Sequence, residues 1–192
     1  MMVVTDEPPE APLVPNALDT RGGHLMLAAS GSILVPFGSY DHSVRAKEAG
    51  FGVGGMADIS FGVTRGVALG VYGRYFTQRF RCDTCRSNTF AVGPFAVYHA
   101  VQGLRFDPWI LFGIAYEKAT VSQPGRTANF SGIEWLRVAI GGDYYALSGF
   151  AFGPYVELDL GSFIDRPDTD DPPTVHGGFV TGLRFAFDTP GR

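Results

Sequence analysis

The stretch TGLRFAF, Thr181–Phe187, alternates large apolar residues with small or charged ones near the end of the chain. Side chains point to opposite faces at successive positions of a strand. Leu183, Phe185 and Phe187 therefore fall on one face if this stretch is extended. The other face receives only small or charged residues, which are Gly182, Arg184 and Ala186. The pattern predicts a strand with one apolar face, a short distance before the chain ends.

The same alternation recurs along most of the chain and predicts eight strands. Each candidate is long enough to cross a bilayer at the usual tilt of a transmembrane strand. The candidates are GGHLMLAASGSILV, FGVGGMADISF, VALGVYGRYF, TFAVGPFAVYHAV, FDPWILFGIAYE, IEWLRVAIGGDYY, FAFGPYVELDLG and VHGGFVTGLRFAF.

The connections between these strands alternate in length. Those after the first, third, fifth and seventh strands are long and polar: PFGSYDHSVRAKEA, QRFRCDTCRSN, KATVSQPGRTANFSG and SFIDRPDTDDPPT. Those after the second, fourth and sixth are short: GVTRG, QGLR and ALSG. Long and short connections thus fall at opposite ends of an up-and-down meander. The sequence therefore predicts an all-β fold, an eight-stranded antiparallel up-and-down transmembrane β-barrel.

Composition and charge exclude two broad classes of protein. The net charge is −4 and there is no basic run, which argues against a nucleic-acid partner. The longest apolar stretch, Phe90–Leu104, is interrupted by Gly93, Pro94 and His99. A membrane-spanning helix needs about 18 or more uninterrupted apolar residues, so a helical membrane protein is not expected.

The two faces of the strands distinguish a membrane barrel from a soluble one. A soluble barrel of the lipocalin type needs apolar residues inside and a dense charged coat outside. Here the second face is rich in Gly, Ala and Ser with a few charges of both signs, which suits a narrow lumen. We predict a lumen charge network whose members are Asp58, Arg74, Glu117, Arg137, Asp143, Glu157, Asp159 and Arg184. The apolar face then points outward, where lipid tolerates it.

The alternation also predicts on which face the aromatic and histidine residues lie. Met56, Trp109 and Leu111 are expected to point inward, as is His176, whereas His99 is expected on the outward face. Several rings near the predicted strand ends fit interfacial anchors. These are Tyr40, Tyr75, Trp109, Tyr116, Trp135, Tyr144 and Tyr145.

Few residue patterns suggest chemistry. Cys82 and Cys85 form the motif CDTC in the second long loop, where a loop-closing disulfide is expected; free thiols or a metal or redox role are the alternatives. His42 and Ser43 are adjacent and would point to opposite sides of an extended chain, a poor arrangement for a base and its nucleophile. We expect no catalytic residue, no metal and no cofactor, and hence no enzyme.

The C-terminal pattern and the strands together resemble a known group of proteins. Thr181, Gly182, Phe185 and Phe187 resemble the C-terminal signal by which outer-membrane proteins are recognised by their barrel-assembly machinery. Those proteins commonly end on the aromatic residue, whereas this chain continues with DTPGR. DPWILFGIAYE and FGPYVELDLG also resemble strands of such proteins. The resemblance covers 22–187 and points to the small outer-membrane barrels of the OmpA, OmpX and OmpW type.

This resemblance implies an organisation and a function. We expect a disordered, proline-rich and acidic lead-in over 1–21, the barrel over 22–187, and a short tail over 188–192. The expected protein lies in the outer membrane of a Gram-negative bacterium and has a structural or surface-interaction role through its extracellular loops. Its expected partners are outer-membrane lipid and lipopolysaccharide, the barrel-assembly machinery, and an unknown loop partner. The alternatives are OmpW-like passage of small hydrophobic molecules and a soluble lipocalin-like binder of apolar ligands.

Overall fold

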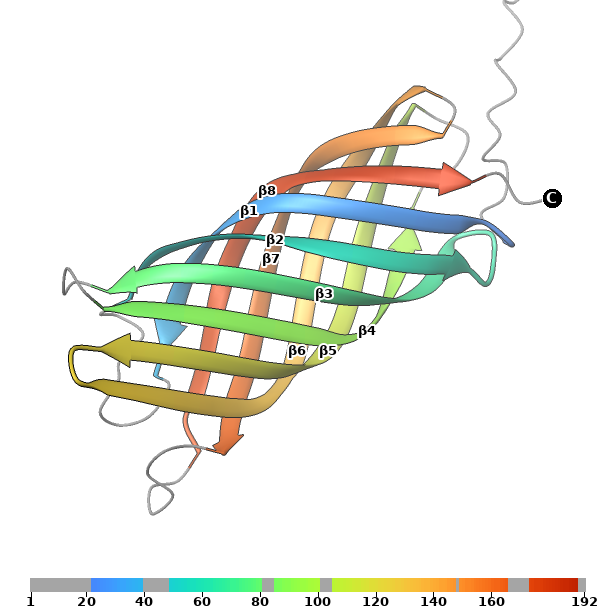
Figure 1. Ribbon diagram of the computed structural model, residues 1–192. Coiled ribbons are helices and arrows are strands. Elements are labelled where there is room, and N and C mark those ends of the chain that lie inside the picture. Colours follow the sequence, from blue (N-terminus) through green and yellow to red (C-terminus); the bar gives the residue numbers. More distant parts are fainter. Residues whose placement is uncertain are drawn as a thin grey trace, which may run out of the picture.

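The structure is a closed barrel of eight antiparallel strands (Figure 1). The computed structural model describes residues 22–39, 49–80, 85–100, 105–147, 149–165 and 173–189. The strands are β1 (Leu25–Gly38), β2 (Ala49–Gly62), β3 (Val67–Phe80), β4 (Arg86–His99), β5 (Phe106–Gln123), β6 (Arg126–Leu147), β7 (Phe150–Asp165) and β8 (Val175–Thr189). Among the described residues, no helix is long and apolar enough to cross a membrane. The predicted fold class is confirmed.

The last strand closes the barrel by pairing with the first. The ladder between β8 and β1 is antiparallel and runs from the pair Leu25 and Thr189 to the pair Gly38 and His176. Every other strand pairs with its neighbours in the sequence. Closure pairs the strand edges with one another, which is the condition for strands to stand in lipid. The terminal stretch Thr181–Phe187 is therefore part of the seam of the barrel.

The two ends of the barrel differ. The connections after β1, β3, β5 and β7 lie at one end, which we call the loop end; those after β2, β4 and β6 lie at the other, the turn end. The described chain also begins and ends at the turn end (Figure 1), because Leu25 pairs with Thr189 there. β8 extends two residues beyond the expected end of the barrel, so that Asp188 and Thr189 belong to the strand. Residues 1–21 and 190–192 lie outside the described residues.

One predicted long loop is wrong. The segment KATVSQPGRTANFSG forms the ends of β5 and β6, which are joined by a turn of two residues, Pro124 and Gly125. Gly125 has a φ of 78°, in the left-handed region that favours glycine. Ala119 and Val121 continue the inward alternation of β5 and are buried. The polar residues that alternate with them, Lys118, Thr120 and Ser122, disguise this pattern, because they lie on the outer face of a strand and not in a loop.

The faces of the barrel follow the alternation. Leu183, Phe185 and Phe187 are 54 %, 47 % and 53 % exposed on the outside, whereas Arg184 and Ala186 are buried inside. The same holds for all eight strands, whose exposed side chains include most of the large apolar residues in the described part of the chain. The barrel thus has a broad apolar outer surface and a lumen that holds the buried charges beside apolar side chains.

Candidate functional site in the barrel lumen

The eight charged residues predicted for the lumen network all lie inside the barrel. Their side chains come from β2, β3, β5, β6, β7 and β8, and each residue is at most 7 % exposed. Seven of them form arginine–carboxylate ion pairs within the lumen, and Glu117 lies within hydrogen-bond distance of His176. They do not form one continuous network. They separate into a central cluster, a pair toward the loop end and a cluster toward the turn end.

Arg74 is the centre of the first group. Its Nη1 donates to Glu157 Oε1 at 2.9 Å and to Asp159 Oδ2 at 2.5 Å. Its Nη2 donates to Glu134. Arg74 stands on β3 and these carboxylates stand on β6 and β7, so the guanidinium bridges the lumen. Such charge-assisted hydrogen bonds are stronger than neutral ones and tie opposite walls together.

Arg137 completes this group from β6. Its Nε and Nη2 donate to Glu157 Oε2 at 2.9 and 2.6 Å. Its guanidinium lies over the ring of Tyr72, whose hydroxyl donates to Glu134 Oε1 at 2.8 Å. Both arginines therefore share Glu157 as an acidic partner. We call this group the central cluster; its members are Tyr72, Arg74, Glu134, Arg137, Glu157 and Asp159.

Glu134 is a member that the sequence prediction missed. Glu134 and Arg137 are three residues apart, so strict alternation would place them on opposite faces. A register shift between Glu134 and Leu136 inserts a bulge into β6, and both side chains point inward. The residues that flank Glu134 could have indicated its inward position. Glu134 stands between Ile133 and Trp135, which are both exposed on the outer face.

A second group lies nearer the turn end. Arg184 donates from Nη1 to Asp143 Oδ2 at 2.7 Å and from Nη2 to Asp58 Oδ1 at 3.3 Å. The Arg184 guanidinium also lies 5.4 Å from the centre of the Trp109 ring. This arrangement joins β8 to β6 and β2. Trp109 is buried beside it, as expected for an inward residue.

Three histidines pair with carboxylates at both ends of the lumen. At the turn end, Nδ1 of His24 lies 2.9 Å from Asp188 Oδ1, and Nδ1 of His99 lies 2.8 Å from Asp107 Oδ2. Toward the loop end, Nε2 of His176 lies 2.8 Å from Glu117 Oε2. The His176 ring also stacks on Phe163, with the ring centres 4.0 Å apart. The network prediction missed Asp107 and Asp188.

Three ring residues lie elsewhere than predicted. His99 is 3 % exposed and points inward, because its neighbour Tyr98 takes the outward position at the end of β4. Trp109 and Tyr145 are also buried in the lumen and are not interfacial anchors. The remaining described rings of that set are exposed, namely Tyr75, Tyr116, Trp135 and Tyr144. Tyr40 lies outside the described residues.

Side chains fill much of the lumen. Tyr72 and Arg137 are almost fully buried in its middle, as are Phe130 and Phe163 toward the loop end. A cavity of about 30 Å³ lies between the central cluster and His176. That volume accommodates about two water molecules. Among the described residues, no group of three or more His, Cys, Asp or Glu side chains is arranged to hold a metal ion.

Comparison with known proteins gives matches of structure. No protein-family model and no curated protein matches the chain. Neisserial surface protein A superposes with a TM-score of 0.59 at 12 % identity, over 85 % of this chain and 96 % of that one. The outer membrane protein OprG of Pseudomonas aeruginosa superposes with a TM-score of 0.57 at 9 % identity, over 90 % and 98 %. The N-terminal β-barrel domain of OprF, from the same organism, gives 0.53 at 16 %, over 88 % and 98 %.

The chain has the fold of the small eight-stranded bacterial outer-membrane barrels. The likeness is one of fold, because each of these chains is at most 16 % identical to this one. It confirms the resemblance found in the sequence.

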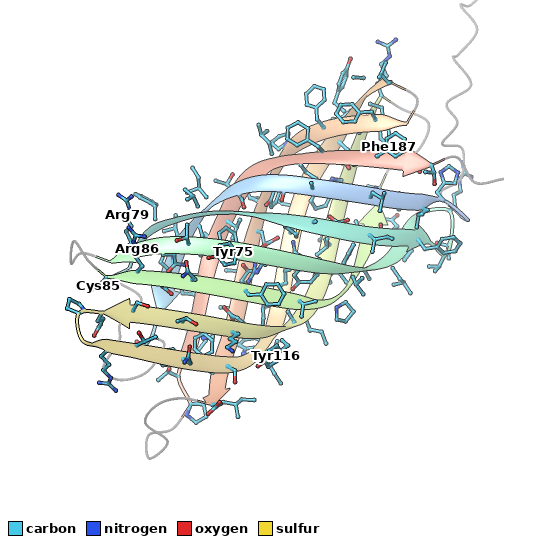
Figure 2. All side chains as sticks on the ribbon, in the orientation of Figure 1. Tyr75, Arg79, Cys85, Arg86, Tyr116 and Phe187 are labelled. Carbon is cyan, nitrogen blue, oxygen red and sulfur yellow. The ribbon has the colours of Figure 1, made fainter. Side chains whose placement is uncertain are left out.

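The predicted assembly signal lies on the strand that closes the barrel. Thr181, Phe185 and Phe187 are exposed on the outer face of β8, and Figure 2 shows Phe187 at the turn end. Gly182 takes an inward position beside β1, where a Cβ would lie 2.3 Å from the carbonyl oxygen of Gly31. Only glycine fits this close approach of two strands. Recognition of these residues by assembly machinery stays a prediction.

The predicted loop disulfide involves the connection between β3 and β4. Cys82 lies outside the described residues, and so does its pairing. Cys85 is described and buried, immediately before β4 begins at Arg86.

Proposed function

We propose that this chain is an integral outer-membrane protein of a Gram-negative bacterium with a structural or surface-interaction role. It acts at its loop end and is not an enzyme. The observation that carries the proposal is the distribution of side chains between the two faces: large apolar side chains cover the outside, whereas the paired charges are buried inside. An apolar surface of this extent is stable next to lipid but not in water.

The charged lumen supports a structural role for the interior. Arg74 and Arg137 share Glu157, and Arg74 also reaches Glu134. Charges that are buried and paired in this way are expensive to separate. A solute moving along the axis would have to break these pairs. The central cluster is therefore better suited to holding the walls together than to passage.

The loop end offers a described element for surface interaction. The hairpin of β5 and β6 reaches its tip at Gln123 and Arg126 (Figure 1). At the loop end, the ladder between β6 and β7 stops at Ser131. Arg126–Phe130 of β6 therefore extends beyond that ladder. Arg126 and Thr127 are exposed. We place the contact with the unknown loop partner at this end.

Passage of small hydrophobic molecules is the second candidate. It is favoured by an apolar layer in the lumen, in which Val97, Trp109 and Leu111 are buried between the charged groups. OprG, one of the structures compared above, has the same fold, and its sequence is 9 % identical to this chain. A soluble lipocalin-like binder would need the opposite faces, with its apolar residues inside and its charges outside.

Labelling of intact cells tests the proposed location and orientation. In cells that express the chain, Thr127→Cys at the loop end should react with a membrane-impermeant maleimide. Thr64→Cys, in the turn between β2 and β3, is the matched control and should react only after the outer membrane is opened. Labelling of Thr64→Cys in intact cells, or protection of both positions, would contradict the proposal.

Efflux from vesicles separates the two candidate functions. Vesicles that contain the folded barrel should retain both a small polar dye and a small hydrophobic ester as well as protein-free vesicles do. Faster passage of the ester alone would favour the second candidate. Faster passage of both molecules would show that the central cluster does not close the lumen.

A further inference from the structure

Two arginines face each other on the outer surface at the loop end. Arg79 of β3 and Arg86 of β4 are direct cross-strand partners, and both side chains are exposed. Figure 2 shows them next to each other, pointing away from the barrel. Like charges directly opposite each other destabilise a strand pair. Among the described residues, no carboxylate pairs with either of them. An anion bound between them would remove this repulsion.

The surface beside the arginines is concave and apolar on one side. A pocket of about 450 Å³ is lined by Arg79, Arg86, Thr77, Phe51 and Val53. Phe51 is 73 % exposed and Val53 is 56 % exposed. The pocket therefore combines two guanidinium groups and a hydroxyl with an apolar wall. This combination fits an amphiphile better than a free ion.

The position of the pocket matches the headgroup level of a bilayer. Along β3, the outward residues are apolar or aromatic at Leu69, Val71 and Tyr75 and then become polar at Thr77 and Arg79. Tyrosine marks the boundary between the lipid-facing band and the headgroups in membrane barrels. Arg79 thus stands just beyond the apolar band, where lipid phosphates lie.

We propose that this pocket binds a membrane lipid that carries a phosphomonoester headgroup. The phosphate lies between Arg79 and Arg86, and an acyl chain runs along Phe51 and Val53. A phosphomonoester carries about −1.5 to −2 charges at pH 7, which matches two guanidinium groups. A phosphodiester carries a single charge and matches them less well. The inference rests on the proposed function, because it requires this face to lie in a bilayer.

Native mass spectrometry of the folded full-length chain in detergent tests the site. The chain is titrated separately with phosphatidic acid and with phosphatidylglycerol of the same acyl chains, and with inorganic phosphate. Phosphatidic acid should bind most tightly. Arg79→Gln with Arg86→Gln should weaken its binding about tenfold, because two exposed ion pairs with the phosphate are lost and each contributes modestly.

Two control variants separate charge from apolar contact. Arg105→Gln with Arg126→Gln removes two exposed arginines elsewhere and should leave lipid binding unchanged. Phe51→Ser with Val53→Ser keeps both arginines and should weaken phosphatidic acid binding. Every variant is first checked for folding by its migration on a gel without boiling.

The outcomes decide between the sources of the anion. Equal binding of the two lipids, or no loss in the variant without Arg79 and Arg86, would overturn the proposal. Binding of inorganic phosphate as tight as that of phosphatidic acid would assign the site to a free anion and overturn it as well. If the unaltered chain does not fold with amphiphile, the proposed membrane location fails first, and the lipid site fails with it.

Discussion

The guanidinium carbon of Arg137 lies 4.0 Å from the centre of the Tyr72 ring, so that β6 and β3 are joined across the lumen by a cation and an aromatic face. The Tyr72 hydroxyl donates at the same time to Glu134. Tyr72 therefore contributes both to packing and to hydrogen bonding, and these two contributions can be measured separately.

Replacement of Tyr72 should separate stacking from hydrogen bonding. Tyr72→Phe keeps the ring under Arg137 and loses the hydrogen bond to Glu134, which should lower the free energy of unfolding by about 1 kcal/mol. Tyr72→Ala also loses the ring and should cost about 3–5 kcal/mol. Urea-induced unfolding in lipid vesicles, followed by tryptophan fluorescence, measures both. Equal losses for the two variants would contradict the stacking contribution.

Removal of Arg137 should be far more damaging than removal of an exposed arginine. Arg137→Ala leaves Glu157 with one of its two cationic partners and opens space in the lumen, so it should lower the free energy of unfolding by about 3–5 kcal/mol. Arg126→Ala, at the exposed tip of the hairpin, should change it by less than about 0.5 kcal/mol. The same unfolding measurement compares them, and similar effects would show that the central cluster is not a structural unit.

Two glycines of neighbouring strands should respond differently to a methyl group. A Cβ on Gly93 would lie 1.9 Å from the carbonyl oxygen of Ile114, whereas one on Gly73 would meet no atom within 4 Å. Gly93→Ala should therefore lower the midpoint of unfolding and cost about 1–3 kcal/mol, the usual effect of overpacking. Gly73→Ala should be tolerated. A reversed order of stability would mean that the two faces of these strands have been exchanged.

A charge placed on the outer face should be costly only in the middle of the apolar band. Ile114 lies near the middle of β5 and is 52 % exposed, so Ile114→Arg should cost about 2–4 kcal/mol in a bilayer. Thr127→Arg, at the loop end, is the matched control and should cost little. Unfolding in vesicles of fixed lipid composition measures the difference. If both substitutions have the same small effect, lipid does not surround β5.

Phe187 should matter for assembly more than for the finished barrel. Phe187→Ser removes the last aromatic residue of the predicted assembly signal, so the amount of folded barrel in the outer membrane of expressing cells should fall several-fold. Phe179→Ser, on the same face of β8 but outside the signal, is the control. Refolding of both variants into detergent in vitro should succeed equally well. Equal yields in cells would remove Phe187 from the signal.

The alternation of apolar with small or polar residues predicts most of the fold but not its irregularities. It predicts the strands and their faces because a lumen and a lipid surface impose opposite demands on successive residues. The bulge at Glu134 breaks the period within one strand, and a strict alternation anchored at Arg137 cannot detect it. The hairpin tip at Pro124 and Gly125 was hidden because polar residues outside the lipid band look the same in a strand and in a loop.

The sequence predicts which charged residues lie in the lumen, but it does not predict which of them contact each other. The eight predicted charges all occupy inward positions of their strands, which alternation identifies. Which carboxylate meets which arginine depends on how far the strands are staggered around the closed barrel. Arg74 reaches Glu157 and Asp159, 83 and 85 residues away in the sequence, and no local pattern relates them. Asp188 was missed for a simpler reason, because β8 continues beyond the expected end at Phe187.

The central claim is that this chain folds as a barrel in a lipid environment, and refolding tests it most directly. The urea-denatured chain is diluted into buffer, detergent or lipid vesicles, and boiled and unboiled samples are compared on a denaturing gel with circular dichroism recorded in parallel. The account predicts β-type spectra and a shift in mobility on boiling only when amphiphile is present. A folded, soluble and monomeric chain in buffer alone would contradict it, because the exposed apolar surface of the barrel would then have no lipid to cover it.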